Sequence, residues 1–138
     1  MARHNEIGII GEDIAVKFLR ERGYVILERN YLRKWGEIDI VTRETSGKVH
    51  FVEVKSVSYE TKSDMDWALF GDSTVPHGTW RPEENVHKNK QERLKRAIQT
   101  WLLDNTYEGT FQIDIITVRV VPGEKYAKVH IIPNVVFE

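Results

Sequence analysis

Residues 36–55 read GEIDIVTRETSGKVHFVEVK and contain two short segments rich in Ile and Val, with a polar stretch between them. Alternating apolar side chains over four to eight residues are typical of β-strands, and the polar residues 45–48 suit a turn. We therefore expect two antiparallel strands, 36–41 and 49–55, joined as a hairpin.

Amphipathic helices are expected before and after this hairpin. Apolar residues recur every three or four positions over 7–22 and again over 85–105, and Gly23 is a natural end for the first helix. Further strands are expected at 24–28, 111–121 and 127–132. The order helix, three strands, helix, two strands predicts an α/β fold with a central mixed β-sheet flanked by helices.

Length and composition favour one globular domain over residues 1–138. Hydrophobic residues make up 41% and charged residues 30%, and no apolar run approaches the ~20 residues that a membrane span needs. The absence of cysteine excludes disulfide scaffolds and cysteine nucleophiles, and the five histidines show no i, i+4 pair that would suggest zinc. Without a signal-peptide pattern, we expect a cytoplasmic protein with no membrane partner.

The segment 56–85 differs in character from the rest of the chain. It carries six acidic and two basic side chains, has no clean periodicity and contains Trp67, Phe70 and Trp80. A connection of this length is typical of a lid or a binding loop. We expect a long acidic loop here, with a short helix near 65–70 as an alternative.

Charged side chains interrupt the apolar pattern of the hairpin. Because residues two apart in a strand share a face, Glu53 and Lys55 project together. Asp39 lies on the partner strand, and we expect it to face away from both Ile38 and Ile40. A suitable register of the hairpin places it beside Glu53. Buried carboxylates at this density are costly unless they are paired or bind a metal.

A third carboxylate comes from the first helix, where Glu12 borders the apolar stripe. Adjacent carboxylates relieve their repulsion on a hard cation such as Mg²⁺ or Mn²⁺. We expect Asp39, Glu53 and the carbonyl oxygen of Val54 as ligands, with Glu12 binding directly or through water. Lys55 would orient or deprotonate the attacking water, which predicts a nuclease. The alternative is an ordinary ion pair between Glu53 and Lys55 on a solvated strand.

Basic side chains gather at the start of the second helix. Over residues 86–96, five Lys or Arg are opposed by Glu92 alone. Such a patch attracts a phosphate backbone, although a solvated helix face is the alternative. The candidate nucleic-acid-binding residues are Lys88, Lys90, Gln91, Arg93, Lys95 and Arg96. On a later strand, Asp114 is a candidate partner for a Lys or Arg of a helix.

Several short motifs together resemble one family. They are Gly11-Glu12, Gly23-Tyr24, Arg29-Asn30, Gly36-Glu37-Ile38-Asp39, Phe51-Val52-Glu53-Val54-Lys55, Lys90-Gln91-Glu92-Arg93-Leu94 and Phe111-Gln112-Ile113-Asp114. Their combination resembles the YraN-like family of uncharacterised bacterial proteins, within the PD-(D/E)XK restriction-endonuclease-like nucleases and similar to archaeal Holliday-junction resolvases. The resemblance covers nearly the whole chain except the acidic loop.

The resemblance implies a restriction-endonuclease-like fold and a metal-dependent endonuclease that hydrolyses DNA, with branched or junction DNA as a candidate substrate. The family's acidic and lysine positions fall on Glu12, Asp39, Glu53 and Lys55, although Ile38 stands where the superfamily often has Pro. Two alternatives stay open: an inactive nucleic-acid-binding module on the same fold, and a scaffold protein that docks through the acidic loop. A homodimer is compatible with the resemblance, but composition does not demonstrate one.

Overall fold

Five strands form one mixed sheet in the computed structural model, which describes residues 3–71 and 88–137. The strands lie across the sheet in sequence order: β1 (Val25–Arg33), β2 (Gly36–Arg43), β3 (Val49–Ser58), β4 (Phe111–Val121) and β5 (Tyr126–Ile132). Neighbouring strands run antiparallel except β3 and β4, which are parallel. The predicted α/β fold with a mixed sheet is confirmed.

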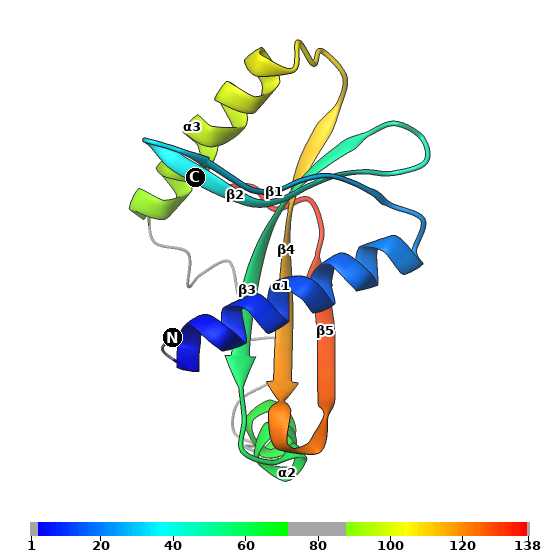
Figure 1. The fold of residues 1–138 in the computed structure, drawn as a ribbon, viewed down its shortest axis with the longest axis vertical. Coiled ribbons are helices and arrows are strands. Elements are labelled where there is room, and N and C mark those ends of the chain that lie inside the picture. Colours follow the sequence, from blue (N-terminus) through cyan, green and yellow to red (C-terminus); the bar gives the residue numbers. More distant parts are fainter. Residues whose placement is uncertain (1–2, 72–87, 138) are drawn as a thin grey trace.

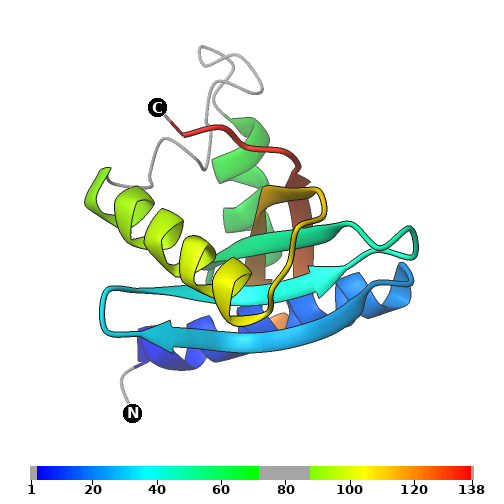
Figure 2. The same cartoon turned by 90° about the horizontal axis from the view of Figure 1, so that it is seen from above.

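Two long helices cover opposite faces of this sheet (Figure 1 and Figure 2). Helix α1 (Arg3–Glu21) packs mainly against β3 and β4, and helix α3 (Lys88–Asp104) packs mainly against β2. Gly23 follows α1 with a φ of +85°, a conformation that glycine adopts at little cost. Within the part of the chain that the structure describes, no helix is long and apolar enough to cross a membrane.

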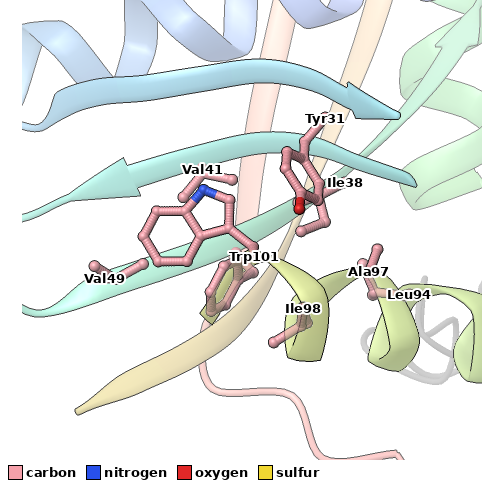
Figure 3. Close-up of a cluster of buried hydrophobic side chains, with 9 residues drawn as sticks. Tyr31, Ile38, Val41, Val49, Leu94, Ala97, Ile98 and Trp101 are labelled. Carbon is pink, nitrogen blue, oxygen red and sulfur yellow. The ribbon is translucent and has the colours of Figure 1, made fainter. Parts of the chain in front are cut away.

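Each long helix buries its apolar stripe against its own face of the sheet. The cluster under α3, shown in Figure 3, contains Tyr31, Ile38, Val41, Val49, Phe51, Leu94, Ala97, Ile98 and Trp101. The cluster under α1 contains Ala15, Val16, Leu19, Ile40, Val52, Ile116, Val118 and Val120. Since each large side chain stabilises the fold by about 1.5–3 kcal/mol when fully buried, these two layers fix both helices on the sheet.

Two glycines allow the helices to approach the sheet closely. A Cβ atom at Gly11 of α1 would lie 1.9 Å from the hydroxyl oxygen of Ser56 on β3. A Cβ atom at Gly36 of β2 would lie 2.1 Å from the carbonyl oxygen of Arg93 on α3. Any side chain at Gly36 would therefore force α3 to move, because its neighbour is backbone, whereas a side chain at Gly11 would force the Ser56 side chain to shift.

The two isoleucines that flank Asp39 lie on opposite faces of the sheet, so the expected regular alternation was wrong here. Ile38 packs under α3, whereas Ile40 packs under α1. Pairing of β2 with β3 begins only at the Ile40–Val52 pair. On the other side of β2, Asn30 has a φ of +51° between the Arg29–Ile40 and Tyr31–Ile38 pairs of the β1–β2 ladder. The backbone thus changes direction at Asp39.

The segment expected as a long loop begins instead with regular structure. Strand β3 continues through Ser58, and the chain then forms helix α2 (Lys62–Asp66) and a π-helical turn (Trp67–Gly71). Met65 is fully buried, which anchors α2 beside β4. The loop prediction was therefore wrong for these residues, and the alternative of a short helix is confirmed. The expected loop from 72 onward, with Trp80, lies outside the described residues, as does the expected start of α3 at residue 85.

Candidate active site

Strands β2 and β3 separate immediately beyond the Ile40–Val52 pair, and Asp39 and Glu53 are the next residue on each strand. At this fork, the carboxylate of Asp39 accepts a hydrogen bond of 2.8 Å from the backbone N–H of Val54. The side chain of Asp39 therefore takes the place of a backbone acceptor from β2. The structure thus brings Asp39 beside the Glu53-Val54-Lys55 segment, as the hairpin predicts.

The electrostatic environment of Asp39 opposes its ionisation. Burial raises the pKa of Asp39 to about 8, and the negative charge of Glu53 acts in the same direction. The Val54 N–H and the Lys90 ammonium favour the ionised form but do not offset the burial. A carboxyl group with a pKa this far above its ordinary value, beside a second carboxylate, is typical of functional sites.

Glu53 is buried and already has a cationic partner. Only 3% of its side chain is exposed, and its Oε1 atom forms an ion pair with the ammonium group of Lys90 from α3. Burial alone would lower the pKa of Lys90, but the Glu53 and Asp39 carboxylates raise it above its usual value. Lys90, which the sequence suggests as a phosphate contact, therefore acts here as the counter-ion of Glu53.

Lys55 lies two residues beyond Glu53 on β3 and is half-buried. Burial lowers the pKa of Lys55, the positive charge of Lys90 lowers it further, and Glu53 partly opposes both. A lysine that loses its proton more readily than usual is suited to proton transfer.

The other candidate residues of α3 remain near its surface. Lys88, Arg93 and Arg96 are exposed, and Gln91 is half-buried. Lys95 lies 3.6 Å from the carboxylate of Glu92, one turn earlier on the helix. None of these placements tests the predicted contact with nucleic acid.

An open cleft of about 670 Å³ lies beside the fork, a volume within the usual range for ligand sites. Its walls come from α1, β1, β2 and β3, and its lining residues include Gly8, Glu12, Arg29, Asn30, Asp39 and Val54. Glu12 therefore shares the cleft with Asp39, as the sequence predicts. The cleft gives solvent and ligands a route to the Asp39 carboxylate.

The carboxylate of Glu12 is held by residues of β1. Its Oε1 atom accepts hydrogen bonds from Arg29 Nε at 3.1 Å and from Asn30 Nδ2 at 3.0 Å. Across residues 3–71 and 88–137, no three acidic or histidine side chains lie close enough together to hold a metal ion. The structure thus brings Asp39 and Glu53 together and leaves Glu12 bound to β1.

The Asp39–Glu53 pair nevertheless fits a hard divalent cation by its donor chemistry. Burial raises the pKa of Asp39 most and the negative charge of Glu53 raises it further, and a bound cation would offset both effects. Mg²⁺ commonly takes only one or two protein carboxylates and fills its other positions with water and phosphate oxygens. Two carboxylates and the Val54 carbonyl oxygen would therefore be a sufficient protein contribution.

Sequence reasoning missed a buried polar network near the β2–β3 turn. His50 is 3% exposed, with Nδ1 lying 2.6 Å from Asp114 Oδ2 and Nε2 lying 2.6 Å from Glu44 Oε2. Asp114 also accepts a 2.9 Å hydrogen bond from the backbone N–H of Asn134. Asp114 therefore pairs with a histidine of β3, and the expectation of a Lys or Arg partner from a helix was wrong.

Comparison with known proteins gives consistent matches over most of the chain. The model of the uncharacterised protein family UPF0102 matches residues 11–118. A UPF0102 protein of Campylobacter jejuni is 34% identical over 112 residues, which cover 81% of this chain and 82% of the relative. A UPF0102 protein of Dictyoglomus turgidum is 31% identical over 132 residues, 95% of this chain and 97% of the relative. A UPF0102 protein of Trichlorobacter lovleyi is 32% identical over 129 residues, 93% and 87% of the two chains.

Proposed function

Given that the chain belongs to the UPF0102, or YraN-like, family, whose name states no activity, we propose from the geometry of its site that it is a metal-dependent nuclease acting on DNA. Family membership confirms the resemblance to the YraN-like family. The observation that carries the proposal is the pairing of Asp39 with Glu53 at the β2–β3 fork, with Lys55 two residues further along β3 and a cleft lined by Asp39 and Val54.

Each residue of the fork has a distinct role in the proposed reaction. Asp39, Glu53 and the Val54 carbonyl oxygen would hold Mg²⁺ or Mn²⁺, which when bound polarises a phosphodiester oxygen and acidifies water. Lys55 follows Glu53 by two residues on β3 and has a pKa lowered by burial, so it would orient the attacking water or accept its proton. Lys90 balances the charge of Glu53 in the described conformation.

A nucleic-acid-binding module without turnover is the second candidate function. Two observations favour it: Glu53 is paired with Lys90, and Glu12 is bound by Arg29 and Asn30 instead of lying with the other two carboxylates. Four points stay predictions: the preference for branched DNA, the homodimer, the cytoplasmic location, and a role of the acidic segment in docking a scaffold protein to its partners.

The test is a cleavage assay on single-stranded, duplex, flap and four-way DNA, with Mg²⁺, Mn²⁺ or EDTA. We expect metal-dependent cleavage by the wild type and a loss of at least about 100-fold in Asp39→Asn and Lys55→Ala, because both groups act on the reacting atoms. Lys17→Ala, which changes an exposed lysine of α1, is the control. Unchanged cleavage by Asp39→Asn would overturn the site, and DNA binding with no cleavage by any protein would favour the binding module.

A further inference from the structure

The wall of the cleft formed by α1 and β1 carries a charged arrangement that the proposed chemistry does not use. We propose that Arg29 binds a phosphate of the DNA backbone there, and that Glu12 and Asp13 are positioning residues that hold its guanidinium group toward the cleft. This inference rests on the proposed function for the identity of its ligand. It also gives Glu12 a role other than binding the metal ion.

The guanidinium group of Arg29 is fixed along one edge. Its Nε atom donates to Glu12 at 3.1 Å, and its Nη2 atom donates to Asp13 at 2.7 Å. Guanidinium has five N–H donors, and among the described residues no acceptor bonds to those of Nη1. Arg29 lines the cleft and its side chain is 37% exposed, so a phosphate oxygen in the cleft can approach the guanidinium group.

The described residues that line the cleft include more acidic than basic side chains. Three acidic side chains, Glu12, Glu37 and Asp39, line the cleft, and Arg29 is the one cationic residue among its described lining residues. Arg29 therefore reduces the electrostatic repulsion that a phosphate group approaching Asp39 would meet. Of the candidate cations of α3, Lys90 also acts on Asp39 but is already paired with Glu53, and α3 packs on the opposite face of the sheet from α1 (Figure 2).

Asn30 completes the arrangement from the neighbouring position of β1. Its φ of +51° lies in the left-handed region, which Asn tolerates better than most residues. Its side-chain amide donates a 3.0 Å hydrogen bond to the same Glu12 oxygen that accepts from Arg29 Nε. Since both partners of Glu12 come from β1, the arginine is held in place before a ligand arrives, which lowers the entropy cost of binding.

The test measures binding of a fluorescently labelled four-way DNA junction in EDTA across a series of salt concentrations, so that cleavage does not interfere. We expect Arg29→Gln to bind about 5- to 10-fold more weakly and the slope of log K against log salt to fall by about one, as for one lost phosphate contact. Arg29→Lys should restore the slope, because lysine keeps the positive charge. It should restore only part of the affinity, because lysine lacks the planar guanidinium group that can form two parallel hydrogen bonds to a phosphate.

Arg20→Gln is the matched control, since Arg20 is an exposed arginine in the last turn of α1. It should keep the wild-type slope. A merely structural role for Arg29 would lower the melting temperature without changing the slope, so equal slopes for Arg29→Gln and wild type would overturn the inference. Absence of DNA binding by the wild type would overturn it too. A reduced slope in a protein that never cleaves DNA would support the inference while contradicting the proposed nuclease.

Discussion

The carboxylate of Asp39 accepts a 2.8 Å hydrogen bond from the backbone N–H of Val54, at the point where β2 leaves β3. This bond ties the acidic side chain to the strand that carries Glu53 and Lys55. The position of Asp39 is therefore set by the sheet itself, while its charge is opposed by burial and by Glu53.

Asp39→Asn should stabilise the protein at alkaline pH. The pKa of Asp39 is raised from 3.8 to about 8 by burial, so the folded protein binds a proton more tightly than the unfolded chain, and stability declines as pH rises from about 4 to 8. Asparagine keeps an acceptor for the Val54 N–H and carries no charge. Urea unfolding at pH 5 and pH 8.5 should show a gain of at least about 1 kcal/mol at the higher pH.

The matched control for this substitution is Asp66→Asn, at an exposed position of α2. It should change stability by less than about 0.5 kcal/mol at both pH values. If Asp39→Asn is no more stable than wild type at pH 8.5, the account of its environment is wrong.

Lys90→Met tests whether the ammonium group of Lys90 and a divalent cation compete for the carboxylate of Glu53. Removing the partner of a 3% exposed carboxylate is expected to destabilise the fold by about 1–3 kcal/mol in the absence of metal. Mg²⁺ or Mn²⁺ should then raise the melting temperature of Lys90→Met more than that of wild type, because the cation no longer displaces Lys90. Differential scanning fluorimetry with and without the ions measures both effects.

Lys95→Met serves as the comparison for Lys90→Met, since Lys95 pairs with the exposed Glu92 at 3.6 Å. We expect it to change stability by less than about 1 kcal/mol and to show the wild-type response to the ions. A Lys90→Met protein with no extra response to metal would argue against ion binding at Glu53.

Gly36→Ala should destabilise the packing of α3 on β2. The added methyl group would lie 2.1 Å from the carbonyl oxygen of Arg93, a backbone atom that can move only with its helix. We expect a loss of about 1–3 kcal/mol, measured as a lower urea midpoint. Gly8→Ala, in the interior of α1 with nothing within 4 Å of the new atom, should instead be neutral or stabilising by up to about 1 kcal/mol. Equal midpoints for the two variants would contradict the packing described for Gly36.

His50 and Asp114 should be strongly coupled in stability. Replacing His50 by Ala leaves Asp114, which is 1% exposed, without its imidazole partner, so the single substitution should cost about 2–4 kcal/mol. A double-mutant cycle of His50→Ala and Asp114→Ala should give a coupling of about 1–3 kcal/mol from urea unfolding. His130→Ala, at an exposed histidine of β5, should be nearly neutral. Additive effects of the two substitutions would show that the network contributes little.

The strands and long helices could be predicted because their apolar residues recur with the period of each structure. The placement of Asp39 beside Glu53 followed from the hairpin, since only a short turn separates the two strands. The opposite facing of Ile38 and Ile40 could not be predicted, because it depends on a local change of backbone direction at the fork. A prediction that assumes strict alternation of side chains along a strand cannot detect such a change.

Contacts between residues far apart in the chain also could not be predicted from the sequence. The pairing of His50 with Asp114 spans 64 positions and depends on the parallel register of β3 with β4, which no local pattern fixes. The Lys90–Glu53 ion pair and the hydrogen bonds from Arg29 to Glu12 and Asp13 likewise could not be predicted. Residue type suggested a functional role for Glu12, Glu53 and Lys90, but only the packing of the helices shows which groups they meet.

The absence of a side chain at Gly11 has a consequence for the arginine at the cleft. Glu12 and Asp13 follow Gly11 directly, and the contact between Gly11 and Ser56 sets the height of this turn of α1 above β3. We expect a bulkier residue at position 11 to clash with Ser56 and to disturb the placement of both acids that hold Arg29. A glycine buried in α1 thus helps to set the position of a charged side chain on β1.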